Sequence, residues 1–523
     1  MKKWINIEDL DGMGDKLATL VGSKVRTPGL RYCDVRLGLE EGFDIVAEDQ
    51  KLKFYRMDFS LNYGIRVIAG PGSASANGFL GGQIGAADFG RALNIISQGI
   101  GIACERAQEN AKRKLKTKKL FPHLSQSILK EVTLARVPVI RDTVKGEYEI
   151  DPRTVQKNEA GEYVLETEAL VRRRFREIKN SLTDVFSLLE RQIFSSSEGS
   201  VIDETHAFTG ASVFYTAQYG KMPTADLYHH AGNQLGWEAL ENAQNVYESD
   251  LSQFALKIAR EAVTLSKARP CPTLKKPAVV VTDPDFNGLV AHEIVGHPAE
   301  LDRALKWETG YAGRSRFLKT LRENQVGSEV ASPLVSAFSD PTLRGGYGHY
   351  LYDDEGTPAQ RVYHIKHGIF REFMSSRETA AIWGSVPNGH YKANSSSAIP
   401  LIRMSVSAFE AGAADPERII KDVERGYYVV GHRIPSISES REHFRISPRL
   451  IYEIKNGRLG QAFRDGSMAA NSEAYLKSID AVGNDFKIFP IPNCGKGQPM
   501  QTKMVGNGGP TMRGRAYLVG REK

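Results

Sequence analysis

The sequence is poor in the features that mark membrane, secreted and disulfide-rich proteins. Its 523 residues include no apolar run of about 18 residues, which is the length that a membrane-spanning helix needs. The opening segment MKKWINIEDL carries two lysines but no apolar stretch behind them, so we expect no secretory signal. The four cysteines form no CxxC pair, which excludes a disulfide framework and a four-cysteine zinc site. We therefore expect a cytoplasmic protein with no membrane partner.

The chain has only a small excess of positive over negative charge. The chain has 69 Lys and Arg against 62 Asp and Glu, a net charge of +7, whereas nucleic-acid-binding domains concentrate basic residues on one face. The one dense basic run, Lys112–Lys119, closes a segment with helical apolar spacing, and cations at a helix C-terminus offset the helix dipole. We therefore predict no nucleic-acid partner.

Hydrophobic periodicity divides the chain into helical and strand-like segments. A chain of this length usually folds as two or three domains. Apolar spacing predicts helices at 86–114, 165–193 and 237–267. Alternation broken by glycines predicts short strands at 31–70, and a further strand region covers 200–220.

The pattern changes near residue 270. Three prolines lie between 270 and 277, where they block helices and strand ladders alike. Short strands dominate beyond them, and Asn456-Gly457 between IYEIK and RLGQAF is a strong hairpin signal. We predict an α+β fold, with a mixed α/β N-terminal domain over 1–269 and a strand-rich domain over 270–523.

One segment, AVVVTDPDFNGLVAHEIVGHP at 278–298, carries the chemistry. AVVVT is typical of a buried strand, and Asp283-Pro284 is a well-formed helix start. The helix then carries His292, Glu293 and His297 as an HExxxH motif. Residues five apart lie about 140° apart around a regular helix. Both imidazoles therefore reach one metal ion only if the helix widens or ends between them.

The residues after the motif indicate an end. Gly296 is a common helix C-cap, and Pro298 disfavours the α conformation at the residue before it. We therefore expect the helix to stop at Gly296, which would allow both histidines to bind zinc. Catalytic zinc has three protein ligands and one open position. Cys271 and Cys494 both lie in this half of the chain, and spacing alone does not choose between them.

Four segments in this order resemble the TldD/PmbA family of metallopeptidases: HEIVGHPAELD, DDEGTPAQ, PNCGKGQP and VGNGGPTMR. YGIRVIAG and GWEALENA in the N-terminal half are weaker matches. The resemblance implies His292, His297 and Cys494 as zinc ligands, and Glu293 as the general base that activates a zinc-bound water. Family members of the TldD type carry HExxxH and PmbA-type subunits lack it, so the sequence is similar to the TldD type.

The resemblance also implies substrates and partners. It points to a peptidase that cuts extended or unfolded peptides inside an enclosed cavity, and to a homodimer or a heterodimer with a PmbA-type subunit. The sequence departs from the family in CGKGQP, one residue shorter than the usual CGKxGQ, and in an additional segment around 193–235.

The alternative is a non-catalytic zinc-binding or regulatory subunit of a protease complex. Glu293 distinguishes the two, because a closed structural zinc site has no use for a carboxylate beside it. Asp353, Asp354 and Glu355 are interpreted as a solvated acidic loop rather than as part of the site.

Overall fold

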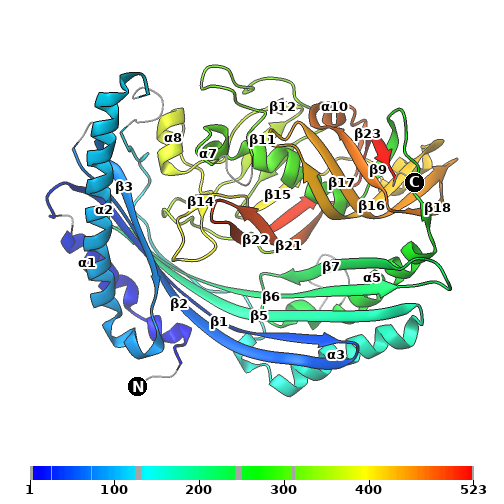
Figure 1. The fold of residues 1–523 in the computed structure, drawn as a ribbon, viewed down its shortest axis with the longest axis horizontal. Helices are drawn as coiled ribbons and strands as arrows, with labels where there is room; N and C mark the ends of the chain where they lie inside the picture. Colours follow the sequence, from blue (N-terminus) through cyan, green and yellow to red (C-terminus); the bar gives the residue numbers. More distant parts are fainter. Residues whose placement is uncertain are drawn as a thin grey trace.

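The structure is a computed structural model, and it describes residues 4–24, 26–71, 74–124, 131–241, 250–308 and 313–520. Its elements form three large sheets and one two-stranded sheet, with helices packed on and between them. In Figure 1 the long strands of the first sheet curve below the C-terminal half of the chain. No helix in these ranges combines the length and apolarity that crossing a bilayer demands.

A seven-stranded sheet is made from the first half of the chain. Its order is β3-β2-β1-β5-β6-β4, with β7 also paired to β6. Only β4 pairs in parallel among the described strands of this sheet. The strands are β1 (Leu30–Glu48), β2 (Lys51–Ala69), β3 (Ala76–Gln83), β4 (Arg141–Val144), β5 (Ile178–Ser196), β6 (Val201–Ala217) and β7 (Ala225–Asn233). The segment around 193–235 therefore supplies strands of this sheet.

Helices cover one face of this sheet. Alternate side chains of a strand share a face, and on β1 these are apolar at Val35 and Leu37 toward one end and at Phe43 and Ile45 toward the other. The first pair packs in one core with α1 and α2, and the second pair packs in another core with α3 and α5. The helices are α1 (Met13–Lys24), α2 (Ala92–Leu120), α3 (Lys157–Arg174), α4 (Glu238–Glu241) and α5 (Leu251–Lys267).

Two predictions for this half are wrong in their details. The region 31–70 forms two 19-residue strands rather than short ones, because its glycines admit a close neighbour instead of ending the strands. A Cβ on Gly64 would lie 2.0 Å from the carbonyl oxygen of Ser396. The region 165–193 is half strand, since α3 ends at Arg174 and β5 follows. Buried Ser and Thr side chains on β5 hide its alternation.

Three other predictions for this half are confirmed within the described residues. The helix predicted at 86–114 is confirmed as α2, and the strand region at 200–220 is confirmed as β6. The helix predicted at 237–267 is confirmed over α5. Residues 242–249 of that prediction lie outside the described residues.

The second half forms the remaining sheets. The eight-stranded sheet has the order β16-β9-β23-β19-β17-β18-β8 with β20 beside β23, and β16 also pairs with β17, so that five strands close into a ring. Its strands are β8 (Arg269–Pro270), β9 (Ala278–Thr282), β16 (Arg425–Ile437), β17 (His443–Lys455), β18 (Arg458–Arg464), β19 (Ser467–Asn471), β20 (Ala481–Val482) and β23 (Met512–Val519). The hairpin predicted at Asn456-Gly457 is confirmed between β17 and β18.

The six-stranded sheet has the order β12-β11-β10-β15-β22-β21. Its strands are β10 (Ala337–Ser339), β11 (Val362–Lys366), β12 (Ile369–Phe370), β15 (Val406–Phe409), β21 (Lys487–Lys496) and β22 (Gln501–Gly509). A small ladder joins β13 (Tyr391–Lys392) to β14 (Leu401–Ile402). The helices of this half are α6 (Pro284–Ala291), α7 (Leu301–Ala304), α8 (Arg377–Trp383), α9 (Pro416–Lys421) and α10 (Ser472–Lys477).

Helix α6 lies between these two sheets and is buried along its whole length. It packs against β15, β21 and β22 on one side and β16 on the other. The α+β fold class is confirmed, and the motif helix is enclosed by strands. The division at residue 270 stays a prediction.

The acidic loop at 353–355 is buried, so its interpretation as a solvated loop is wrong. Asp354 and Glu355 are 2% and 1% exposed. Asp354 pairs with Arg36 of β1 at 2.7 Å, and Glu355 pairs with Arg66 of β2 at 2.6 Å. The loop thus ties the second half to the polar face of the N-terminal sheet, because each buried carboxylate needs a charged partner.

Candidate functional site

The motif helix begins as its sequence predicts. The Asp283 side chain accepts a hydrogen bond from the Phe286 N–H at 2.8 Å, and Pro284 takes the first helical position. The same carboxylate accepts the N–H of Gly431 on β16 at 2.9 Å. The start of α6 is therefore fixed both as a helix cap and to the neighbouring strand.

After Ala291 the helix widens instead of ending. Residues His292–Gly296 form a π-helical turn, in which the His297 N–H bonds to the His292 carbonyl. An i→i+5 bond brings residues five apart to the same side of the helix. Gly296 and His297 both keep α-region backbone angles. The expected C-cap at Gly296 is therefore wrong, and widening solves the spacing problem that the HExxxH motif poses.

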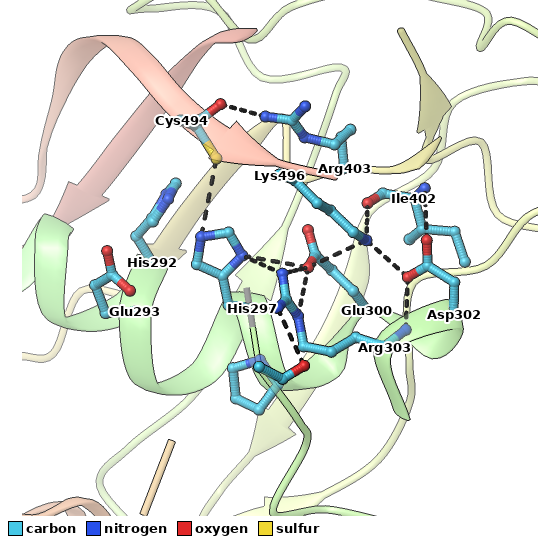
Figure 2. Close-up of polar contacts among 12 residues, drawn as sticks. His292, Glu293, His297, Glu300, Asp302, Arg303, Ile402, Arg403, Cys494 and Lys496 are labelled. Atoms are coloured by element: carbon cyan, nitrogen blue, oxygen red, sulfur yellow. Dashed lines mark hydrogen bonds and ion pairs between the residues drawn. The ribbon is translucent and has the colours of Figure 1, made fainter. Parts of the chain in front are cut away.

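The wide turn brings the two histidines to Cys494 on β21. One donor atom from each of His292, His297 and Cys494 lies within 4.8 Å of the other two, and all three residues are buried. Cys494 Sγ is 3.9 Å from His297 Nε2 (Figure 2). Cys271, the other cysteine that spacing left open, lies outside this cluster, where its thiol donates to the Pro272 carbonyl.

Each histidine is oriented through its second ring nitrogen. His292 Nδ1 is 2.9 Å from Asn507 Oδ1, and His297 Nδ1 is 3.2 Å from Glu300 Oε2. Such outer contacts fix the tautomer and turn the other nitrogen toward a metal. Lys496 pairs with the same Glu300 oxygen at 3.3 Å. Figure 2 draws this contact beside His297. The sequence analysis did not identify Glu300, Lys496 or Asn507 as part of the site. They lie in HPAE, CGK and VGN, within the segments that resemble the family.

The Cys494 thiol is held in its ionised form. Burial alone would raise the pKa of this thiol, but the charges of His292, Arg403 and His297 lower the pKa well below its usual value. Burial lowers the pKa of His292, but Cys494, Glu293 and Asn507 together raise it above its usual value. A thiolate is the form of cysteine that binds metal ions.

The donor set fits a zinc ion. Zinc bonds of about 2.0–2.1 Å to nitrogen and about 2.3 Å to sulfur place tetrahedral ligand atoms about 3.3–3.6 Å apart. The 3.9 Å between Cys494 Sγ and His297 Nε2 is close to that separation. Two imidazoles, which bind metal ions in their neutral form, and one thiolate match the ligand types of catalytic zinc sites, which keep a fourth position open.

Glu293 lies beside the cluster and is paired with a cation. Its Oε2 accepts a hydrogen bond from Arg441 Nη1 at 2.7 Å. Burial would raise the pKa of Glu293, but His297, Arg441 and His292 together lower it. The carboxylate is therefore ionised and able to accept a proton.

A cavity of about 710 Å³ joins these groups. It is lined by the three cluster residues, Glu293 and Arg441, and residues of β7 and β16 also contribute to its lining. Ligand sites commonly occupy about 300–1,000 Å³, so the space suffices for a short stretch of peptide. Because β7 belongs to the N-terminal sheet, both halves of the chain form this cavity.

The sequence was compared with known protein families and with curated proteins. Residues 275–520 match the PmbA/TldA metallopeptidase C-terminal domain. A metalloprotease of Methanocaldococcus jannaschii is 27% identical over 483 residues, which cover 92% of this chain and 95% of that protein. A zinc metalloprotease TldD homolog of Saccharolobus solfataricus is 25% identical over 334 residues, 64% of this chain and 69% of that protein.

Solved structures share the fold over almost the whole chain. A putative modulator of a DNA gyrase from Thermotoga maritima has a TM-score of 0.71 at 14% identity, covering 97% of this chain and 100% of that one. TldE from Thermococcus kodakarensis has a TM-score of 0.64 at 16% identity, with the same coverage. At these identities the likeness establishes the fold alone. Residues 275–520 thus carry the C-terminal domain of the PmbA/TldA metallopeptidases, and the chain is similar over most of its length to proteins named metalloprotease, a TldD homolog among them.

Proposed function

We propose that the protein is a zinc-dependent peptidase that hydrolyses peptide bonds of extended or unfolded chains inside its cavity. The observation that carries this proposal is the buried cluster of His292, His297 and Cys494 with an ionised Glu293 on the wall of one cavity. Relatives named metalloprotease, one of them a zinc metalloprotease, support the same chemistry.

The roles of the residues follow from their contacts. Zinc held by the two histidines and Cys494 would polarise the scissile carbonyl and lower the pKa of a water molecule. Glu293 accepts a proton from the attacking water and delivers it to the leaving amine. Asn507 and Glu300 hold the imidazoles so that their other nitrogens face the cavity.

The edge of β21 supports an extended substrate. In the order of the six-stranded sheet β21 is the last strand, and β22 is its one partner among the described strands. Asn493, Cys494 and Gly495 of β21 line the cavity. A peptide that pairs with such an edge is bound through its main chain, so many side-chain sequences are accepted. A folded protein has few segments free to pair in this way.

The proposal includes a dimer, formed either with a second copy or with a PmbA-type subunit. The structural likeness to TldE, a chain of the same fold, supports the second arrangement. Pairing would cover strand edges of the kind that soluble proteins avoid exposing. Light scattering on the purified chain gives the mass, and a monomer that cuts folded and unfolded chains equally fast would contradict both the dimer and the substrate class.

The experiment that tests the function compares one protein substrate in two states. Unfolded casein should be cleaved, and a native disulfide-bonded protein should be cleaved only after reduction. Removing metal with a chelator should abolish cleavage, and Zn²⁺ should restore it. Cleavage that survives complete chelation would contradict the proposal. Bound zinc without any turnover would instead support the alternative of a non-catalytic subunit.

A further inference from the structure

Arg441 is a cation built into the cavity wall beside Glu293. It lies in the turn between β16 and β17, where its φ is +66°. Non-glycine residues rarely adopt that conformation unless their surroundings hold it. Here the Ser472 hydroxyl donates to the Arg441 carbonyl at 2.7 Å, and the Arg441 N–H donates to the Ser438 carbonyl at 2.9 Å. The turn thus presents this side chain at a fixed place.

The guanidinium and the proposed base touch in the buried part of the cavity. Arg441 Nη1 is 2.7 Å from Glu293 Oε2, and each residue is 9% exposed. Two other arginines near the cluster are enclosed in the protein. Arg303 pairs with Glu300 at 2.6 Å, and Arg403 donates to main-chain carbonyls of Cys494 and Gln501. Both are 0% exposed, whereas Arg441 lines the cavity.

During peptide hydrolysis, negative charge disappears from one group near Arg441 and forms on another. When Glu293 takes a proton from the attacking water, its carboxylate becomes neutral and its ion pair with Arg441 is lost. At the same time the water oxygen bonds to the scissile carbonyl carbon, and the C=O π electrons move onto the carbonyl oxygen. A negative charge therefore leaves Glu293 as another appears in the same cavity. A guanidinium has five N–H donors, enough to serve both.

We propose, building on the peptidase function above, that Arg441 is a catalytic residue whose guanidinium passes from the Glu293 carboxylate to the oxyanion of the tetrahedral intermediate. As the intermediate collapses, the carbonyl re-forms and the C–N bond breaks. The leaving amine takes the proton from Glu293, and Arg441 returns to the regenerated carboxylate. Arg441 thus faces one negative charge at every stage. Donors aimed at developing charge in a water-poor site are a major source of rate enhancement.

The test removes the guanidinium and then supplies it from solution. Arg441→Gly suits the left-handed backbone, because glycine adopts positive φ without strain, and it leaves space for free guanidinium. The probes are a quenched fluorogenic peptide from a casein segment that the wild type cleaves, and its phosphinic analogue, in which an anionic tetrahedral phosphinate replaces the scissile amide. Arg445→Ala is the matched control, since Arg445 lies on the same hairpin and outside the cavity lining.

We expect kcat of Arg441→Gly to fall about 10²–10³-fold, with KM and zinc content near wild type. Millimolar guanidinium should restore part of kcat and leave Arg445→Ala unchanged. The phosphinic peptide should lose affinity by a factor similar to the loss in kcat/KM, because it resembles the transition state.

A kcat within threefold of the Arg445→Ala control, or unaltered affinity for the phosphinic peptide, would overturn the assignment. A purely structural role predicts lower thermal stability and no rescue. If Arg441→Gly does not fold, Arg441→Lys decides, because lysine keeps the charge without the fork of donors: a kcat equal to wild type contradicts the proposal, and a reduced kcat with unchanged KM supports it. A wild-type protein that cleaves no peptide refutes the peptidase function itself, which is a separate outcome.

Discussion

Replacing Glu300 by glutamine removes one negative charge from a fully buried ion network. Glu300 pairs with Arg303 at 2.6 Å and lies 3.3 Å from Lys496, and all three residues are 0% exposed. Lys496 also pairs with Asp302 at 2.7 Å. The two carboxylates and two cations balance, and this balanced group holds His297 Nδ1.

The size of the effect follows from that balance. Glu300→Gln leaves one buried cation in excess, and breaking a buried pair in this way costs about 3–5 kcal/mol of unfolding free energy. The glutamine oxygen still accepts from His297 Nδ1, but without a charge. Loss of such an outer partner typically lowers metal affinity about 10–100-fold.

A second substitution should restore part of the lost unfolding free energy. Lys496→Met alone leaves one carboxylate in excess, whereas in the double variant the one remaining carboxylate, Asp302, and the one remaining cation, Arg303, balance in charge. The cost of the double variant should therefore be smaller than the sum of the single costs, by about 1–3 kcal/mol. Glu323→Gln and Lys319→Met form the matched control, because their ion pair is exposed and exposed ion pairs contribute little to stability.

The assay is urea unfolding for all variants, with zinc affinity measured by competition with a chelating dye. Single costs that add to within about 0.3–0.5 kcal/mol, together with wild-type zinc affinity in Glu300→Gln, would refute the argument that this network is coupled and supports His297.

Three further predictions concern other parts of the site and fold. Cys494→Ala should lose its zinc by metal analysis while Cys271→Ala keeps it, and the reverse result would overturn the ligand assignment. Gly296→Ala places a Cβ 2.0 Å from Met404 Sδ, so urea unfolding should show a loss of about 1–3 kcal/mol; no loss would mean that the wide turn tolerates a side chain. Burial lowers the pKa of His364 to about 4, so stability present above about pH 6.5 is lost as the pH falls toward 4. His364→Gln should shrink the drop in unfolding free energy between pH 7 and pH 5 by about 2 kcal/mol, and an unchanged drop would contradict a neutral buried imidazole.

Local signals in the sequence predicted those parts of the fold that local chemistry decides. A carboxylate cap and a proline at the first position suffice to start α6, and Asn456-Gly457 suffices for a tight hairpin, because each depends only on neighbouring residues. The α+β class followed from periodicity in the same way.

The predictions that were wrong concern features that depend on residues far away in the sequence. Gly296 and Pro298 are typical of a helix end, yet the helix continues as a wide turn packed against Met404 and Ser407. No local pattern shows that contact. The acidic loop at 353–355 looked solvated because its arginine partners lie about 300 residues away in the sequence.

The candidate site shows the same division. Residue type and spacing named the histidines and Glu293, and the resemblance added Cys494. Asn507 and Glu300 were missed because their function is visible only as contacts with the second nitrogen of each imidazole. Arg441 was missed because it comes from a hairpin turn without a motif, 148 residues from Glu293.

The central claim is that Glu293 acts as the base beside a metal held by His292, His297 and Cys494. The most direct measurement is zinc content and casein hydrolysis on one preparation of Glu293→Gln, beside the wild type. We expect unchanged zinc content and folding, with hydrolysis reduced about 10²–10⁴-fold, the usual contribution of a general base. Hydrolysis at the wild-type rate in the zinc-loaded variant would contradict this claim.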